Sequence, residues 1–154
     1  MTENVRKKSR AEPPIKTGDF ADDKEVHRLV AAFEQAALTP AQFHHGAHLA
    51  VALSYLASLP EAEATARMRS SLQRFTAYHG VDVYHETVTL FWMRLLHHLT
   101  RTTHQALPLW QRINLIADRY VTFSPVKVHY SPQSLRTAKA RKQWVPPDRA
   151  PLEF

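Results

Sequence analysis

The stretch from Leu49 to Leu59, LAVALSYLASL, is apolar nearly all the way round a helix, and this feature constrains the fold most strongly. A helix without a polar face is stable only where other elements cover most of its sides. The wider apolar run, 47–59, is too short and too interrupted to cross a bilayer, which needs about 20 apolar residues. We therefore expect this segment to be the central helix of a folded core.

The segments on both sides of this run show the hydrophobic spacing of helices that can pack around it. We predict helices over residues 22–37, 39–58, 61–79, 84–99 and 109–120. The sequence TPAQ at 39–42 offers an N-cap threonine, a proline at the first helical position and a glutamine that completes a capping box, so the central helix is expected to begin there. No strand-like alternation of useful length occurs in the sequence. The prediction is an all-α fold, a single-domain helical bundle of about five helices.

Both ends of the chain are expected to lie outside the regular bundle. Residues 1–20 are polar, charged and interrupted by Pro13 and Pro14, and this composition predicts a disordered basic N-terminal tail. From residue 121 onward prolines recur, so we expect an irregular C-terminal tail with one short turn at 132–140. The bundle domain is thus expected to cover residues 21–154, with this tail included.

The net charge of +6 lies at the two ends of the chain. Residues 1–16 hold five basic and two acidic side chains, and residues 127–154 hold six and two, whereas residues 17–126 hold nine and ten. A domain that reads nucleic acid usually has its basic face on the folded body. We therefore expect solubilising tails and no nucleic-acid partner, with salt-sensitive binding through the tails as the weaker alternative.

The absence of cysteine excludes disulfides and thiolate metal ligands. The basic N-terminal residues are not followed by the apolar run of a secretory signal, and the sequence has no membrane span, so we expect a cytoplasmic protein. The apolar central helices leave surplus hydrophobic surface that a homodimer would bury, and the sequence leaves monomer and dimer equally open.

Three histidines stand at the start of the central helix, in the sequence FHHGAHL at 43–49. His45 and His48 are three residues apart and therefore project from one helix face, which continues into the core. His44 points about 100° away from His45 and is expected to be exposed. Because His-x-x-His is a weak motif by itself, the alternative is that these histidines are satisfied polar residues of the core.

A second stretch, YHETVTLFW at 84–92, places a histidine and an acid at the start of another apolar segment. His85 begins the apolar stripe of that helix, and Glu86 lies about 100° round from it. Two neighbouring helices can bring three imidazoles and a carboxylate together, as helical bundles with metal sites do. We predict a metal site formed by His45, His48, His85 and Glu86. These ligands suit Fe or Zn best, with Mn, Ni and Cu as further options.

The C-terminal tail combines aromatic residues with prolines that cannot continue a helix. The tail is expected to pack across the open end of the bundle, because this would bury the apolar side chains of Trp144, Val145 and the two prolines after them. Tyr130 would then lie near the predicted metal, and we take it with Glu86 as a candidate catalytic residue. The alternative is that the tail only caps the hydrophobic end of the bundle.

These motifs resemble those of a family of bacterial hypothetical proteins of similar length. That family shows an aromatic residue followed by x-His-x-x-His-Leu, then Tyr-His-Glu-Thr, and finally Tyr-Ser with Pro-Asp-x-x-Pro-Leu. The matching segments here are FHHGAHL, YHET, YS and PDRAPL, within residues 25–152. The resemblance implies no particular activity. It implies that the histidines, the acid and the closing residues of the family correspond to His45, His48, His85, Glu86, Tyr130, Ser131, Pro147, Asp148 and Pro151.

The predicted site supports two classes of function. The first is a small metal-dependent enzyme acting on a small-molecule substrate, in which Glu86 completes the metal's ligands or acts as general base on metal-bound water. Zn would indicate a hydrolase or lyase, and Fe with two histidines and a carboxylate an oxygenase. The second is a non-catalytic helical binding module whose core histidines are structural. The sequence has no phosphate-binding glycine loop, nucleophile elbow or dinucleotide fingerprint that would identify the substrate.

Overall fold

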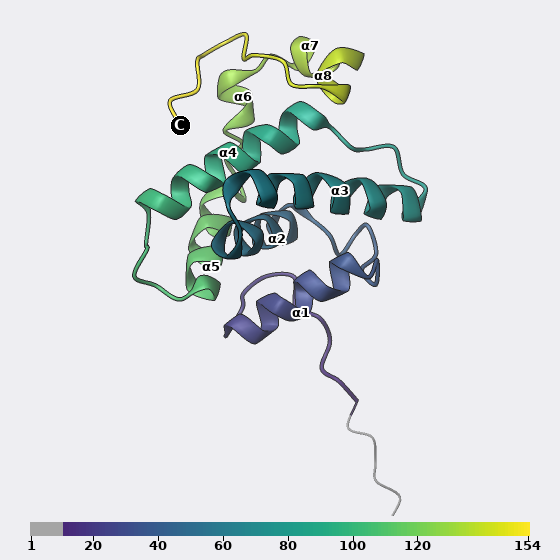
Figure 1. The fold of residues 1–154 in the computed structure, drawn as a ribbon, viewed down its shortest axis with the longest axis vertical. Helices are drawn as coiled ribbons and strands as arrows, with labels where there is room; N and C mark the ends of the chain where they lie inside the picture. Colours follow the sequence, from purple (N-terminus) through teal and green to yellow (C-terminus); the bar gives the residue numbers. More distant parts are fainter. Residues whose placement is uncertain (1–10) are drawn as a thin grey trace, which may run out of the picture.

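The computed structural model describes residues 11–154 as a bundle of helices (Figure 1). Five long helices come first and three short ones follow: α1 (Asp23–Glu34), α2 (His45–Ser58), α3 (Glu61–His79), α4 (Glu86–Thr102), α5 (Leu109–Tyr120), α6 (Val126–His129), α7 (Pro132–Leu135) and α8 (Ala138–Lys142). No strand occurs in residues 11–154. The prediction of an all-α bundle is confirmed. None of these helices is long and apolar enough to cross a membrane.

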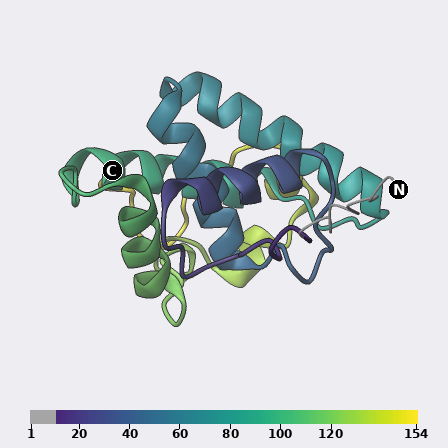
Figure 2. The same ribbon diagram turned by 90° about the horizontal axis from the view of Figure 1, so that it is seen from below.

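The apolar helix α2 lies at the centre of the bundle, as its sequence predicts. Nine of its fourteen residues are buried, and α1, α3, α4 and α5 all pack against it. Figures 1 and 2 show these helices in two perpendicular views. Full burial of a large apolar side chain contributes about 1.5–3 kcal/mol, so a helix of this composition gains most when every side is covered.

The start of α2 differs from the prediction, because a buried phenylalanine follows the capping box. The box itself forms: the Thr39 N–H donates to Gln42 Oε1 (2.9 Å), and the Gln42 N–H donates to Thr39 Oγ1 (3.2 Å). It closes only a turn, since Phe43 enters the core and stacks on Phe33 with ring centroids 4.2 Å apart. The regular helix therefore begins at His45, not at the predicted position.

His44 provides the N-cap that the threonine was expected to provide. Its Nδ1 accepts the N–H of Gly46 (3.2 Å), while its Nε2 lies 3.0 Å from Thr17 Oγ1. The side chain is exposed, as predicted. It nevertheless has a structural role, because it satisfies a backbone donor that the first helical turn leaves open.

The chain before α1 is packed where it is described. Residues 1–10 lie outside the described residues, so the predicted disordered tail is described only at 11–20. Phe20 is 2% exposed, and its backbone exchanges two hydrogen bonds with the side chain of Asn114 in α5, at 3.0 and 2.9 Å. Lys16 forms an ion pair with Glu25 of α1 at 3.0 Å. The predicted tail boundary at residue 20 is therefore wrong, because Phe20 belongs to the core.

The C-terminal segment, residues 126–154, holds three short helices where the sequence predicted one turn. α8 packs against α4, and Figure 1 shows the segment lying over α4 on the side away from α1. Ser131 and Thr137 cap α7 and α8, since their hydroxyls accept backbone N–H groups at 3.1 Å. These caps help to define helices of only four and five residues.

Candidate functional site

His45 and His48 line one cavity, of about 120 Å³, between α2, α3 and α4. Both come from the first turn of α2, and they share a helix face as their spacing predicts. The rest of the lining is Leu49, Ala52, Met68, Leu72, Val88, Thr89, Trp92, Met93 and Leu96. Two imidazoles and the Thr89 hydroxyl are therefore the main polar groups around an otherwise apolar space in the bundle.

Burial favours the neutral form of both imidazoles, most strongly that of His48, because His45 as a whole residue is exposed at the start of α2 and only its ring is partly covered. It lowers the pKa of His48 to about 4, and the neighbouring His45 adds to this effect. Burial also lowers the pKa of His45, with a smaller contribution from His44. The rings are held by aromatic contacts: His48 stacks on Phe43 (3.9 Å between centroids), and His45 meets Trp92 edge-on (4.8 Å). A neutral imidazole offers one N–H donor and one nitrogen acceptor to whatever enters the cavity.

His85 is engaged elsewhere, as the N-cap of α4. Its Nδ1 accepts the N–H of Val88 (3.3 Å), and its Nε2 lies 2.8 Å from the carbonyl oxygen of Leu135 in α7. Since Nδ1 accepts, the ring proton is on Nε2 and is donated to that carbonyl. Both nitrogens are thus used within the fold, and His85 is not among the residues that line the cavity.

Glu86 is buried and paired instead of facing the two α2 histidines. Only 5% of the residue is exposed. Arg69 of α3 binds it with two nitrogens, Nη2 to Oε1 at 2.7 Å and Nε to Oε2 at 3.2 Å, and the Tyr84 hydroxyl also donates to Oε2. Burial, together with Glu86, raises the pKa of Tyr84 to about 12, so this hydroxyl remains a donor. The carboxylate therefore connects α3 to the start of α4.

The predicted metal site is not assembled from these four residues. Among residues 11–154, no three His, Cys, Asp or Glu side chains lie close enough together to hold a metal ion. His85 and Glu86 have other partners, and only His45 and His48 share a cavity. Metal binding by these two histidines stays a prediction.

Tyr130 is a buried structural residue, which corrects its expected position beside the site. It is 1% exposed, and its hydroxyl donates to the carbonyl of Val145 at 2.8 Å. Burial raises its pKa to about 12. The next residue, Ser131, donates its N–H and its hydroxyl to the two oxygens of Asp148, at 2.9 and 2.5 Å. The Tyr-Ser and Pro-Asp motifs thus join the two halves of the C-terminal segment.

Thr87, which the site predictions left out, attaches the C-terminal segment to α4. It is fully buried, and its hydroxyl shares one hydrogen between the carbonyls of Ala140 (2.7 Å) and Gln143 (2.9 Å). The same oxygen accepts the N–H of Val145 at 3.3 Å. Its place in YHET, beside two predicted site residues, was the only indication in the sequence. Of the YHET residues, His85 and Thr87 hold the C-terminal segment, whereas Tyr84 and Glu86 join α3 to α4.

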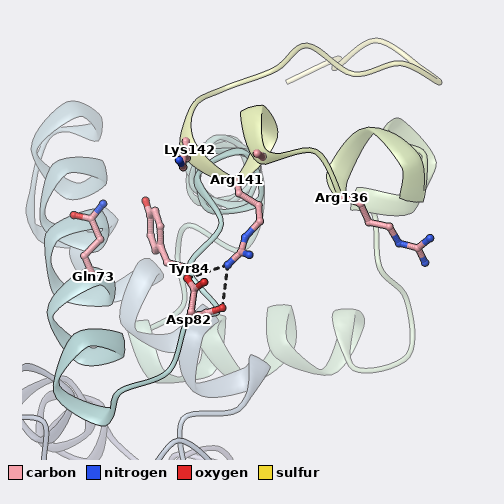
Figure 3. Close-up of a pocket in the computed structure, with 7 residues that line it drawn as sticks. Gln73, Asp82, Tyr84, Arg136, Arg141 and Lys142 are labelled. Atoms are coloured by element: carbon pink, nitrogen blue, oxygen red, sulfur yellow. Dashed lines mark hydrogen bonds and ion pairs between the residues drawn. The ribbon is translucent and has the colours of Figure 1, made fainter.

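A more polar hollow lies between α3 and α8, outside the predicted site (Figure 3). Arg136, Arg141 and Lys142 contribute to its lining. The Arg141 guanidinium is bound to the backbone oxygen of Asp82 (2.9 Å) and to its carboxylate (3.1 Å). Figure 3 shows Arg136 directed away from this pair. An anion in the hollow would therefore find Arg141 already paired and Arg136 directed elsewhere.

Comparison of the chain with protein-family models, with curated proteins and with solved structures found no match. The family resemblance of the motifs therefore remains an expectation. The cavity and its two neutral imidazoles are the evidence on which a function can be argued.

The attachment of the C-terminal segment can be tested at Thr87. Replacing it with valine keeps the shape of the side chain but leaves two buried carbonyls and the Val145 N–H without their partner. We expect the free energy of unfolding to fall by about 2 kcal/mol, and hydrogen exchange to accelerate first in 138–145. Thr102→Val, an exposed change on the same helix, should cost less than about 0.5 kcal/mol in urea unfolding. Equal effects of the two variants would contradict the role of Thr87.

Proposed function

We propose that this protein binds a small, mainly apolar molecule in the cavity between α2, α3 and α4. The observation that carries the proposal is the lining: two neutral imidazoles and one hydroxyl in an otherwise apolar space. Each neutral imidazole and the hydroxyl can both donate and accept a hydrogen bond. A ligand with one hydroxyl or similar neutral polar group would exchange such a bond with them, while its apolar part would fill the remaining space.

The size and charge of the cavity indicate the kind of ligand. A volume of about 120 Å³ is similar to that of an engineered apolar cavity of about 150 Å³ that binds benzene. A neutral imidazole exchanges hydrogen bonds with a hydroxyl without the cost of burying a charge. We therefore expect a single-ring alcohol such as phenol to bind more tightly than benzene. Binding of this kind needs no chemistry at the site, so the proposal is closer to a binding module than to an enzyme.

Titration with phenol and with benzene, followed by amide shifts in NMR spectra, tests this proposal. His48→Leu should weaken phenol binding about threefold to tenfold, the value of one hydrogen bond, and leave benzene binding unchanged. Ala52→Leu should abolish both, because Ala52 lines the cavity and a larger side chain would fill it. His27→Leu changes an exposed histidine of α1 and should match the wild type. Wild-type protein that binds neither probe would overturn the proposal.

The metal-dependent enzyme stays the second candidate. The observation that favours it is that His45 and His48 share a cavity and that burial lowers the pKa of both, because the neutral imidazole is the form that binds metals. Elemental analysis of the purified protein beside His45→Ala and His48→Ala tests this candidate. One equivalent of Fe or Zn that both variants lose would favour it over simple ligand binding.

A further inference from the structure

An open groove adjoins the cavity on the side of α5 and α6. It has a volume of about 500 Å³, and its far wall includes Tyr120, Phe123 and Lys127. Three residues, His45, Val88 and Trp92, belong to the lining of both the groove and the cavity. The two spaces therefore adjoin at these three side chains.

The partition between the two spaces consists of side chains rather than backbone. His45 contacts the edge of Trp92 (4.8 Å between centroids), and Trp92 in turn contacts Tyr120 (5.4 Å). His45 is exposed at the start of α2, so its ring has room to change rotamer. Rotation of this ring would widen the passage beside Trp92 without any movement of a helix.

The groove carries apolar groups that the fold itself leaves uncovered. Val121 is 74% exposed and Phe123 is 51% exposed. Large exposed apolar side chains that lie close together usually indicate a binding surface. Both line the groove. Among the described residues of this lining, Lys127 is the one with a permanent positive charge, and its side chain is exposed. An occupant should thus have an apolar body and an anionic end.

We propose that the cavity and the groove form one binding site for an aromatic compound with a short side chain that ends in a carboxylate. The ring lies in the cavity, the side chain passes His45 and Trp92, and the carboxylate pairs with Lys127. This inference rests on the proposed function, because the ring occupies the same cavity. It adds the groove, the anionic group and the passage between the two spaces.

Calorimetric titration with three probes tests the inference: phenol, para-hydroxyphenylpropanoate, and the neutral para-hydroxyphenylpropanol. Because each buried methylene strengthens binding about fourfold, the two longer probes should bind at least about fivefold more tightly than phenol. Lys127→Met should weaken binding of the acid about threefold and leave the alcohol unchanged. Lys139→Met, an exposed change on α8, is the matched control. Phe123→Ser should weaken both long probes and leave phenol unchanged.

The outcomes separate the two proposals. Tighter binding of the long probes, with the acid alone sensitive to Lys127→Met, supports the single extended site. If phenol binds but the acid binds no more tightly, or is insensitive to Lys127→Met, the inference is overturned and the cavity proposal stands. If phenol does not bind, both are overturned, and binding of the acid alone would then place it in the groove without the cavity.

Discussion

Replacing Phe91 with alanine should lower the free energy of unfolding by about 3–5 kcal/mol. Phe91 is fully buried in α4. The centroid of its ring lies 5.6 Å from that of His129, 6.2 Å from that of Tyr130 and 5.5 Å from that of Phe154. All three belong to the C-terminal segment, so truncation of Phe91 would open a cavity between that segment and the bundle.

Urea unfolding monitored by both circular dichroism and fluorescence measures this effect. Phe123→Ala is the matched control, because the Phe123 side chain is half exposed and its loss should change the free energy by less than about 0.5 kcal/mol. Phe91→Leu, which retains most of the apolar volume, should fall between the two. A loss below about 1 kcal/mol for Phe91→Ala would contradict the packing of the C-terminal segment on α4.

The long helices were predictable because their sequence patterns and their packing agree. The central position of α2 follows from its uniformly apolar sequence, and the predicted 109–120 segment is the observed α5 (Leu109–Tyr120). α3 begins after Pro60 and ends at His79; the next residue, Gly80, has φ of 64° and so adopts the left-handed conformation that favours glycine. Apolar spacing, a proline before a helix and a glycine after it depend only on neighbouring residues, so the sequence alone indicates them.

The ends of the chain were not predictable, because their structure depends on distant partners. Phe20 is held by Asn114, 94 residues away in the sequence. Thr87 is bonded to residues 53, 56 and 58 positions further along. Composition alone made both ends look irregular, and it contains no information about such long-range hydrogen bonds. The capping box at Thr39 shows the same limit, since burial of Phe43 outweighs a local signal that is itself correctly formed.

Two of the four predicted metal ligands line the candidate cavity. The spacing of His45 and His48 placed them on one core-facing side of α2, and both line the cavity. The prediction placed His85 inside a helix over 84–99, whereas α4 begins two residues later, at Glu86. His85 is the N-cap of α4, where its extended backbone directs the ring to α7, and Arg69 provides a nearer partner for Glu86.

Acid should destabilise this protein through His48 before it affects most carboxylates. The pKa of this imidazole is about 4 in the folded protein because of burial, whereas it is about 6.5 in an unfolded chain. As the pH falls through this range, the unfolded state binds the proton first, so stability is lost between about pH 6.5 and 4. The shift corresponds to a loss of about 3 kcal/mol, fully regained at pH 7.

The variant His48→Leu isolates this contribution, because leucine packs beside Phe43 without titrating. In urea unfolding with chelator present, the difference in unfolding free energy between wild type and this variant should shift by about 3 kcal/mol in favour of the variant from pH 7 to pH 4. His27→Leu, at an exposed position on α1, should keep the pH dependence of the wild type. If His48→Leu does so too, the His48 ring is solvated in solution, and the cavity then lacks the desolvated imidazole on which phenol recognition depends. The same pair of variants therefore tests the stability of the fold and the chemistry of its candidate site.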